Sequence, residues 1–351
     1  VVGWVRLFND PSGLDEGPLA LISEHLVNTL KWTIPALLLY DGCRSRERFL
    51  FGVFSFLGAL LFLSLMTIKV MPLSAPLMSG DELQHVALRL PRSIGYHRVT
   101  LSMMLAGASW ALVATRPLFQ DWRVRMCVLV AAAVVVYAQS LTAGRAGYAT
   151  WAVIGVTVGL LRYRAMLLAL PAAALAVWLF MPGVVERVTK GFVSDPFGNT
   201  TTVDQYEATS GRNLAWPYVI AQIQRGPWIG WGRQAMRRVG ITAFLNDFLF
   251  EEFGHPHNAY LEWLLDNGVI GFLPVALFYM VILYHSLRLF LDSRSLFFVA
   301  AGGVSSAMVL ALLIAGFGSQ SFYPIEGTTH MWCAMGLMLR VSVERRDALS
   351  R

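Results

Sequence analysis

The chain has 351 residues, of which 56% are hydrophobic and only 14% are charged, and its formal net charge is +6. The hydrophobic residues form blocks long enough to cross the hydrocarbon core of a bilayer, which excludes an ordinary water-soluble domain. The sequence has no basic stripe with interleaved aromatic residues, so nucleic-acid binding is not expected. Cys43, Cys127 and Cys333 form no CxxC pair and predict neither a disulfide framework nor a zinc site.

Nine apolar stretches predict an all-α, polytopic transmembrane bundle. In chain order they cover residues 26–40, 49–68, 99–115, 126–142, 147–161, 165–181, 268–287, 296–316 and 329–343. A large extramembrane segment, residues 182–267, interrupts the series and is expected to be mostly helical. The sequence therefore predicts a transmembrane region 1–181, the segment 182–267 as the part that carries the chemistry, and a transmembrane region 268–351 with a charged tail.

The positive charge follows a topological pattern, because arginines cluster in alternate connections between the apolar stretches. Lys and Arg near the ends of spans are retained in the cytoplasm, so these clusters are predicted to lie inside. The opposite face then receives residues 182–267 and the turn from Gly144 to Gly147. The clusters are Arg44, Arg46 and Arg48; Arg116, Arg123 and Arg125; Arg162 and Arg164; Arg288 and Arg294; and Arg340, Arg345, Arg346 and Arg351.

The first residue, Val1, falls on the outer face in this topology. No secretory signal pattern occurs at the start of the sequence. We therefore expect an odd number of spans upstream of Val1, which would return the true N-terminus to the cytoplasm.

Polar residues are concentrated just before the seventh stretch, in His255-Pro256-His257-Asn258-Ala259-Tyr260-Leu261-Glu262-Trp263. Titratable imidazoles at the edge of a bilayer indicate chemistry or binding. Upstream, a helix is predicted from Ser210 to about Gln224, with Ser210 as its N-terminal cap. The sequence from Gly226 to Gly232 predicts a turn, in which glycines permit positive φ and tryptophans suit the membrane interface.

Several short motifs occur in one order between about residues 126 and 290. They are Gly144-Arg145-Ala146-Gly147, Ser210-Gly211-Arg212 with Trp216, Pro227 to Gly232, His257 to Glu262, and Gly268 to Gly271. Together the motifs resemble the O-antigen ligase and polymerase superfamily. Within this resemblance, Arg145 matches the family's arginine at the end of a transmembrane helix.

The resemblance implies a glycosyltransferase of the bacterial inner membrane whose active site faces the periplasm. Members of the superfamily use undecaprenyl-diphosphate-linked glycans as donors, without a nucleotide sugar, a cofactor or a required metal. The expected function is O-antigen ligase, which moves O-antigen to a sugar hydroxyl of lipid A-core. An O-antigen polymerase and a protein O-oligosaccharyltransferase are the alternatives. Ligases of the family have about a dozen spans, so three are expected to precede Val1.

Arg145 and Arg212 are the expected donor-binding residues, because arginine offers a permanent charge and a bidentate fork to a diphosphate. Arg145 is predicted at the outer membrane boundary, where a charge without a partner is costly. Two ordinary alternatives stay open. Arg145 could reach a lipid phosphate or cap a helix, and Arg212 could be an ordinary surface arginine.

His257 is the expected catalytic base, because imidazole can take a proton from a sugar hydroxyl that attacks the anomeric carbon with inversion. His255 competes for this role and ranks second, since the family pattern places its histidine directly before an asparagine, here Asn258. A histidine that only caps the next span is the alternative. The expected supporting residues are His255, Asn258 as a helix cap, Tyr260, Glu262 as the partner of His257 or of an arginine, Ser210 and Trp216.

A retaining mechanism with two carboxylates is not expected, because the nearest pair, Glu251 and Glu252, consists of neighbours on a surface segment. A transporter or flippase for lipid-linked glycans is the alternative from another class, although its usual broken helices and midplane charges are not evident. Residues 72–95 are interpreted as holding a short surface helix. Arg233, Arg237 and Arg238 are interpreted as cations that attract an anionic acceptor or meet lipid headgroups.

Overall fold

The computed structural model describes residues 2–14, 16–194, 201–250, 253–318 and 321–350, so Glu251, Glu252 and Arg351 lie outside the described part. The described residues are mostly helical, as predicted, and β1 (Phe192–Ser194) and β2 (Thr201–Val203) form one short antiparallel pair. The chain divides into two units. The small unit contains residues 1–27, 189–279 and 316–323, and the large unit contains residues 28–188, 280–315 and 324–351.

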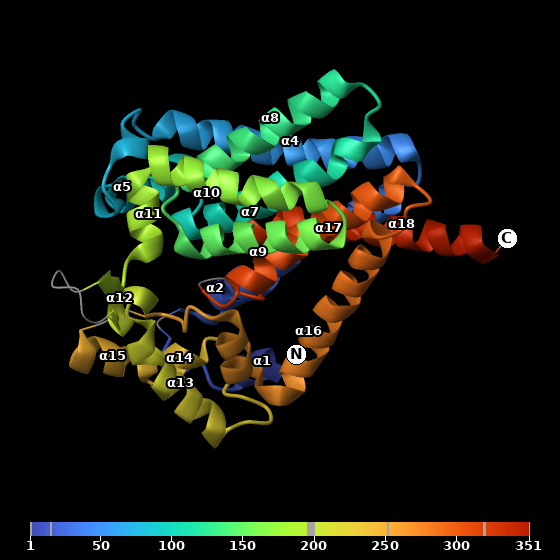
Figure 1. The fold of residues 1–351 in the computed structure, drawn as a ribbon. Helices are drawn as coiled ribbons and strands as arrows, with labels where there is room; N and C mark the ends of the chain where they lie inside the picture. Colours follow the sequence, from blue (N-terminus) through green and yellow to red (C-terminus); the bar gives the residue numbers. More distant parts are fainter. Residues whose placement is uncertain (1, 15, 195–200, 251–252, 319–320, 351) are drawn as a thin grey trace. The chain divides into compact units, whose positions relative to one another are not determined.

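The large unit is a bundle of helices, drawn mainly in blue, green and red in Figure 1. Its helices are α3 (Asn28–Gly42), α4 (Arg46–Val70), α5 (Gly80–Ala87), α6 (Leu90–Ile94), α7 (Arg98–Thr115), α8 (Trp122–Ser140), α9 (Arg145–Leu161), α10 (Ala169–Phe180), α11 (Pro182–Thr189), α17 (Leu296–Ala315) and α18 (Thr329–Ser350). Residues 72–95, predicted to hold one short surface helix, contain two short α-helices, α5 and α6. Helix α5 begins with a capping box, in which Ser79 and Glu82 each accept a hydrogen bond from the other's backbone N–H.

Helices α7 and α17 form the core of the large unit. They pack against each other, and α7 also contacts α8 and α9. All residues of α7 from Leu101 to Thr115 are buried. Small residues permit this close approach, since a Cβ at Gly303 would lie 2.6 Å from the Cβ of Ala114. Helices in a membrane usually associate by close packing through small residues, because the hydrophobic effect does not drive their association in lipid.

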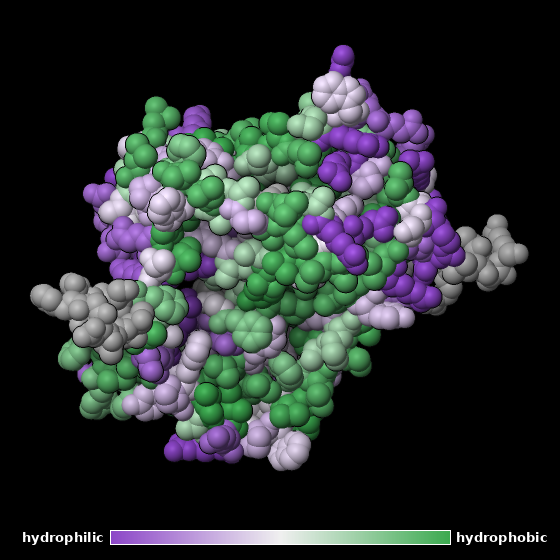
Figure 2. Space-filling view, viewed as in Figure 1, coloured by the Kyte–Doolittle hydropathy of each residue, from purple (hydrophilic) through white to green (hydrophobic). Residues whose placement is uncertain are grey.

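Among the described residues, five helices are long and apolar enough to cross a membrane: α4, α7 with the turn that follows it, α8, α16 (Ala259–Phe290) and α17. The bent pair formed by residues 164–180 and 182–189 gives a sixth if it is one span, and α9 is a shorter apolar helix. All nine predicted spans fall on helices, but the number of membrane crossings stays a prediction. Figure 2 shows apolar side chains over the middle of the bundle helices and hydrophilic ones towards their ends. The chain is a multi-pass membrane protein.

Several of the predicted inner arginines meet at one end of the large unit. The Arg162 guanidinium donates to the Phe290 carbonyl at 3.2 Å, and Arg345 pairs with Asp292 at 2.6 Å. The Arg116 guanidinium lies over the Tyr163 ring, 5.5 Å from its centroid. The ends of α7, α9, α16 and α18 therefore share one polar layer, which agrees with the predicted clustering of the arginines on one side.

The small unit contains shorter helices around the first half of α16. They are α1 (Val2–Asn9), α2 (Pro18–Ile22), the π-helix η1 (Ser23–Val27), α12 (Gln205–Thr209), α13 (Arg212–Arg225), α14 (Ala235–Arg238) and α15 (Ile241–Leu249). Their apolar core includes Ala215 and Val219 of α13, Leu245 of α15 and Leu265 of α16. Helix α13 confirms the helix predicted between Ser210 and about Gln224, and Pro217 lies inside it.

Helix α16 is broken at Gly268, whose φ of 61° and ψ of −172° are not helical. The predicted start of the seventh span coincides with this break. The turn from Gly226 to Gly232 packs on it, and Gly230 and Gly232 have positive φ, as the glycine spacing predicted. Four backbone hydrogen bonds join the two segments: Val269 N–H to Pro227 O, Ile270 N–H to Trp228 O, Trp231 N–H to Leu265 O and Gly232 N–H to Asp266 O, at 2.8 to 3.0 Å.

We expect Gly268→Ala to destabilise the protein by about 3 kcal/mol or more, because it adds two costs. A side chain disfavours this φ/ψ region, and a Cβ would lie 2.4 Å from the Trp228 carbonyl group. Gly240→Ala is the matched control, since Gly240 also has positive φ but its Cβ would meet nothing within 4 Å. It should cost only about 1 kcal/mol. Thermal unfolding in detergent measures both, and equal losses would contradict the close-packing argument.

Candidate functional site

His255 and His257 lie together in the segment from Gly254 to Asn258, here called the histidine loop. Their rings are 4.0 Å apart between centroids, and the His257 backbone N–H donates to His255 Nδ1 at 3.2 Å. The edge of the His257 ring meets Phe253, at 5.4 Å between centroids. His257 has a φ of 51°, which is uncommon for a residue with a side chain. Strained backbone that the surrounding structure holds in place is often associated with function.

Arg212 is the first residue of α13 and is half-buried. The residues before it, Ser210 and Gly211, both have left-handed backbone, and Ser210 ends α12 instead of capping α13. The prediction of Ser210 as the N-terminal cap is therefore wrong. The Asn213 N–H is bonded instead by the hydroxyl of Thr209, at 3.3 Å, because the left-handed pair reverses the chain and brings Thr209 to the start of the helix.

Trp216 links α13, the helix that begins with Arg212, to the histidine loop. Its indole Nε1–H donates to the Pro256 carbonyl at 2.9 Å. Arg212 and Trp216 are four residues apart and so lie on the same face of α13. The pKa of His255 is lowered, first by desolvation and then by the positive charges of Arg212, Arg233 and Arg237, while Glu262 acts in the opposite direction. His255 is therefore neutral near pH 7, and the arginine and the imidazoles belong to one electrostatic site.

Asn258 caps the first turn of α16, as predicted. Its Oδ1 accepts from the Tyr260 and Leu261 N–H groups at 3.0 and 3.1 Å. Tyr260 stacks on Phe317 at 4.4 Å and meets Phe322 edge-on at 4.8 Å, so it joins α16 to the segment 316–323. The two residues hold the helix that follows the histidine loop.

Glu262 pairs with an arginine, which was one of its two predicted roles, and the arginine is Arg233. The Arg233 Nη1 lies 3.3 Å from Glu262 Oε1 and 3.4 Å from Asp266 Oδ2. Its guanidinium also lies over the Tyr323 ring, 3.3 Å from the centroid. The Arg233 side chain is only 13% exposed, so the interpretation of Arg233 as a cation for headgroups or an anionic acceptor is wrong. The two carboxylates stabilise the buried guanidinium charge, which water would otherwise solvate.

The carboxylates of this network are held by further hydrogen bonds. Ser321 donates to Glu262 Oε2 at 2.6 Å, and the Tyr323 hydroxyl donates to Asp266 Oδ2 at 2.9 Å. The pKa of Tyr323 is raised well above its ordinary value, first by burial and then by the charge of Asp266, so its hydroxyl stays protonated. The Ala235 N–H donates to Asp266 Oδ1 at 3.0 Å. The network thus ties α14, α16 and the segment 316–323 together.

Sequence reasoning missed Asp266, Asn267 and Tyr323. Asp266 is 2% exposed, and Asn267 donates to the Tyr323 hydroxyl at 2.7 Å. One signal was available, because Asp266-Asn267 follows Trp263-Leu264-Leu265 and precedes the apolar stretch at Gly268. A carboxylate inside an apolar run needs a partner. The identity of that partner, Arg233, is set by the turn at Gly226–Gly232 and cannot be read from spacing along the chain.

Arg145 belongs to the large unit, where it is the first residue of α9 and half-buried. The turn before it is tightly packed, since Ser102 donates to the Gly144 carbonyl at 3.3 Å and a Cβ at Gly147 would lie 2.0 Å from the Ser102 hydroxyl. Arg98 also reaches this turn and donates to the Ala143 carbonyl at 2.8 Å. A cation at a helix N-terminus is unfavourable with respect to the helix dipole, so helix stability does not account for Arg145.

Arg145 and Arg212 share one local design. Each is the first residue of its helix and follows a glycine, which has no side chain to cap the helix. Backbone N–H groups at a helix N-terminus combined with an arginine form a setting for a phosphate-type anion. The fold and these sites define a multi-pass membrane protein with basic groups and imidazoles placed at or just before the first turns of helices.

Residues 127–276 match the family model described as O-antigen ligase. The match confirms the predicted resemblance to the O-antigen ligase and polymerase superfamily over this segment. It includes Arg145, Arg212 and the histidine loop, and it supports a membrane glycosyltransferase of the ligase or polymerase type. Among curated proteins, none matches the chain significantly.

We expect Arg233→Ala to lower the free energy of unfolding by about 3 to 5 kcal/mol, because it leaves Asp266 buried without its cation. Asp266→Asn added to Arg233→Ala should recover part of this loss, since the uncompensated charge is then gone. Arg237→Ala is the control. Its side chain is 46% exposed and pairs with Glu16 at 3.7 Å, so about 0 to 1 kcal/mol is expected. Equal effects of the two single variants in thermal unfolding would contradict the role of the network.

Proposed function

We propose that this protein is an O-antigen ligase, which transfers O-antigen from undecaprenyl diphosphate to a sugar hydroxyl of lipid A-core. The observation that carries the proposal is the Trp216–Pro256 hydrogen bond, which brings the arginine at the start of α13 to the histidine loop within a segment that matches the O-antigen ligase family. A permanent cation and a neutral imidazole in one site suit the transfer of a group from a diphosphate to a hydroxyl.

The donor diphosphate is bound by Arg212 and Arg145 in this proposal. Both are held at helix N-termini, where backbone N–H groups add to the positive field. Negative charge on the diphosphate grows as the bond to the anomeric carbon breaks, and fixed cations stabilise that growth. The arginines therefore lower the barrier for departure of undecaprenyl diphosphate and do not only bind it. The transfer step requires neither a cofactor nor a metal ion, since the two guanidinium groups supply the charge.

His257 removes the proton from the acceptor hydroxyl as its oxygen attacks the anomeric carbon. The carbon–oxygen bond to the diphosphate breaks on the opposite side, so the anomeric configuration is inverted. The contact between the His257 N–H and His255 Nδ1 holds the two rings together, which leaves His255 as the alternative base. Glu262 and Arg233 act in opposite directions on the electrostatics of the loop, because Glu262 raises the pKa of His255 and Arg233 lowers it. Four further residues position the histidine loop and α13: Asn258, Tyr260, Trp216 and Ser210.

The proposed setting is the bacterial inner membrane, with residues 182–267 as the periplasmic catalytic segment between transmembrane regions 1–181 and 268–351. The arginines at one end of the large unit support this orientation, because positive charge near span ends is retained in the cytoplasm. The first residue of α9, Arg145, then lies on the periplasmic side. Nine membrane crossings in this chain belong to the same proposal.

The first experiment is transfer by purified protein from an undecaprenyl-diphosphate-linked glycan, with lipid A-core, a second lipid-linked glycan or a protein offered as acceptor. His257→Ala should reduce the rate of transfer to lipid A-core by about 100- to 10,000-fold, as expected for loss of a general base. His85→Ala, which changes an exposed histidine of α5, should transfer like the wild type. His255→Ala is tested in parallel, and a larger loss there than in His257→Ala would give the base role to His255.

The wild-type product decides between the related activities. Elongation of the lipid-linked glycan would make the protein a polymerase, and modified protein would make it an oligosaccharyltransferase. Transfer to none of the acceptors, combined with movement of the lipid-linked glycan across a vesicle membrane, would replace the ligase proposal with a transporter or flippase.

Arg212→Lys and Arg145→Lys test the donor site. Lysine keeps the charge but loses the bidentate fork, so we expect turnover to fall about 10- to 100-fold and to fall further, about 100- to 1,000-fold, in the alanine variants. Arg225→Ala is the matched control, because Arg225 is an exposed arginine at the other end of α13. If the alanine variants at positions 145 and 212 retained wild-type turnover at saturating donor, the donor-site assignment would be wrong.

A further inference from the structure

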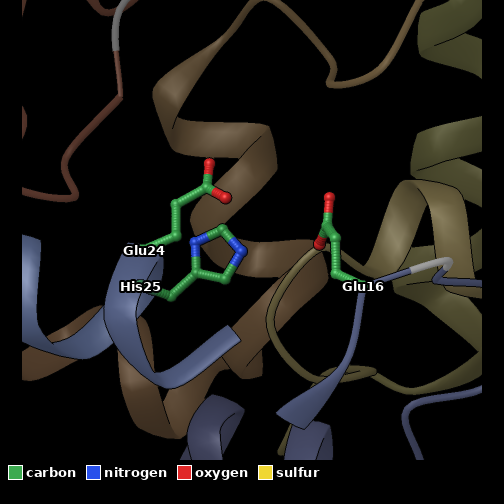
Figure 3. A group of neighbouring side chains, drawn as sticks. All are labelled: Glu16, Glu24 and His25. Carbon is green, nitrogen blue, oxygen red and sulfur yellow. The ribbon is translucent and has the colours of Figure 1, made fainter. Parts of the chain in front are cut away.

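A second cluster of polar side chains lies in the N-terminal part of the small unit. Glu24 and His25 come from η1, and Glu16 comes from the segment before α2. Figure 3 shows the three side chains next to one another, with the Glu24 carboxylate above the His25 ring and the Glu16 carboxylate to its side. One possible ligand atom from each residue lies within 4.8 Å of those of the other two. His25 is 6% exposed and Glu24 is exposed, so the cluster has one buried side and one side open to water.

One carboxylate oxygen of Glu16, Oε2, is buried, and a nearby positive charge would stabilise it. Its Oε2 has no hydrogen-bond partner among the residues that the structure describes. Its Oε1 lies 3.7 Å from the Arg237 guanidinium, which is a long contact with a side chain that is 46% exposed. Such a pair contributes little, whereas an oxygen that is itself buried without a partner is costly, even though the Glu16 side chain as a whole is 34% exposed. A cation bound between Glu16 and its neighbours would remove this cost.

Gln234 supports the ring of His25. Its side-chain amide contacts His25 Nε2, and its Oε1 is buried with no partner among the described residues. The oxygen and nitrogen of a carboxamide can exchange places by a half-turn of the group. The His25 Nε2–H then donates to the Gln234 side-chain oxygen. A histidine held in this way through one ring nitrogen by a neighbouring oxygen is the arrangement that orients metal-binding imidazoles.

We propose that Glu16, Glu24 and His25 form a binding site for one Zn²⁺ ion. Two carboxylates and one imidazole are three protein ligands, which leaves one position of a tetrahedral zinc ion for water. Mg²⁺ and Ca²⁺ prefer oxygen ligands alone and suit this set less well. The ion connects the segment before α2 to η1 and, through Gln234, to the start of α14. It is a structural ion, and the inference does not rest on the proposed transfer function.

Equilibrium dialysis of the detergent-purified, chelator-treated protein against Zn²⁺, with metal content measured by mass spectrometry, tests the site. The wild type should bind one ion, and Glu16→Gln combined with His25→Gln should lose it. Glu47→Gln combined with His85→Gln is the matched control, since it removes an exposed carboxylate and an exposed imidazole from α4 and α5. The control should keep the ion. Retention by the site variant, or no stoichiometric binding by the wild type, would overturn the proposal.

Two further variants test whether Zn²⁺ binds at the arranged ligands described above or only at surface carboxylates. Gln234→Leu should weaken Zn²⁺ binding about 10- to 100-fold, as expected when the group that orients a ligand is removed. Arg237→Ala should strengthen binding, because it removes a cation that competes for Glu16. Unchanged affinity in both would contradict the geometry described here.

X-ray absorption of the zinc-loaded wild type does not depend on whether the variants fold. Only nitrogen and oxygen neighbours at about 2.0 to 2.2 Å are expected for the proposed ligands. A sulfur neighbour at about 2.3 Å would place the ion at a cysteine instead, with the exposed Cys127 as the candidate, and would overturn the proposal.

Discussion

The ion pairing of Arg233 with Glu262 and Asp266 is the interaction on which the small unit depends. Arg233 lies between two carboxylates and on the face of Tyr323, and each of these groups is held in turn by another part of the chain. Such a buried network is costly to assemble, but its loss would leave Asp266 as an uncompensated charge. Because α14, α16 and the segment 316–323 all contribute, the network is complete only when these segments are in place. It therefore favours a single arrangement of residues next to the histidine loop.

The break in α16 at Gly268 makes this arrangement possible. The four hydrogen bonds from the turn 226–232 are made where α16 changes direction, and they bring Arg233, the residue after the turn, to Glu262 and Asp266. Residues before the break carry polar groups, whereas residues after it form an apolar helix suited to a membrane. One glycine thus separates the part of α16 that serves the site from the part that forms a span.

The same principle of fixed polar groups at helix beginnings appears at three places. Arg145 and Arg212 begin α9 and α13 after glycines, and Asn258 caps α16 directly after the histidine loop. Helix N-termini favour anions, so arginines at these positions add to an existing positive field instead of being stabilised by it. Such an arrangement is unfavourable for the isolated helices, which is consistent with positions kept for binding a diphosphate.

The sequence by itself determined the multi-pass helical class, helix α13, the turn at 226–232, the cap at Asn258 and the resemblance to the superfamily. These features follow from apolar length, turn residues and motif order, all of which are local properties of the chain. Tertiary structure decided that Thr209 bonds the start of α13 instead of Ser210, that Arg233 is buried with Glu262 and Asp266, and that Trp216 reaches Pro256. Two of these contacts join residues that are distant in sequence. The third, from Thr209, depends on the left-handed backbone at Ser210 and Gly211, which reverses the direction of the chain. Their energies depend on burial and on the direction of the chain, and neither quantity is encoded in residue spacing.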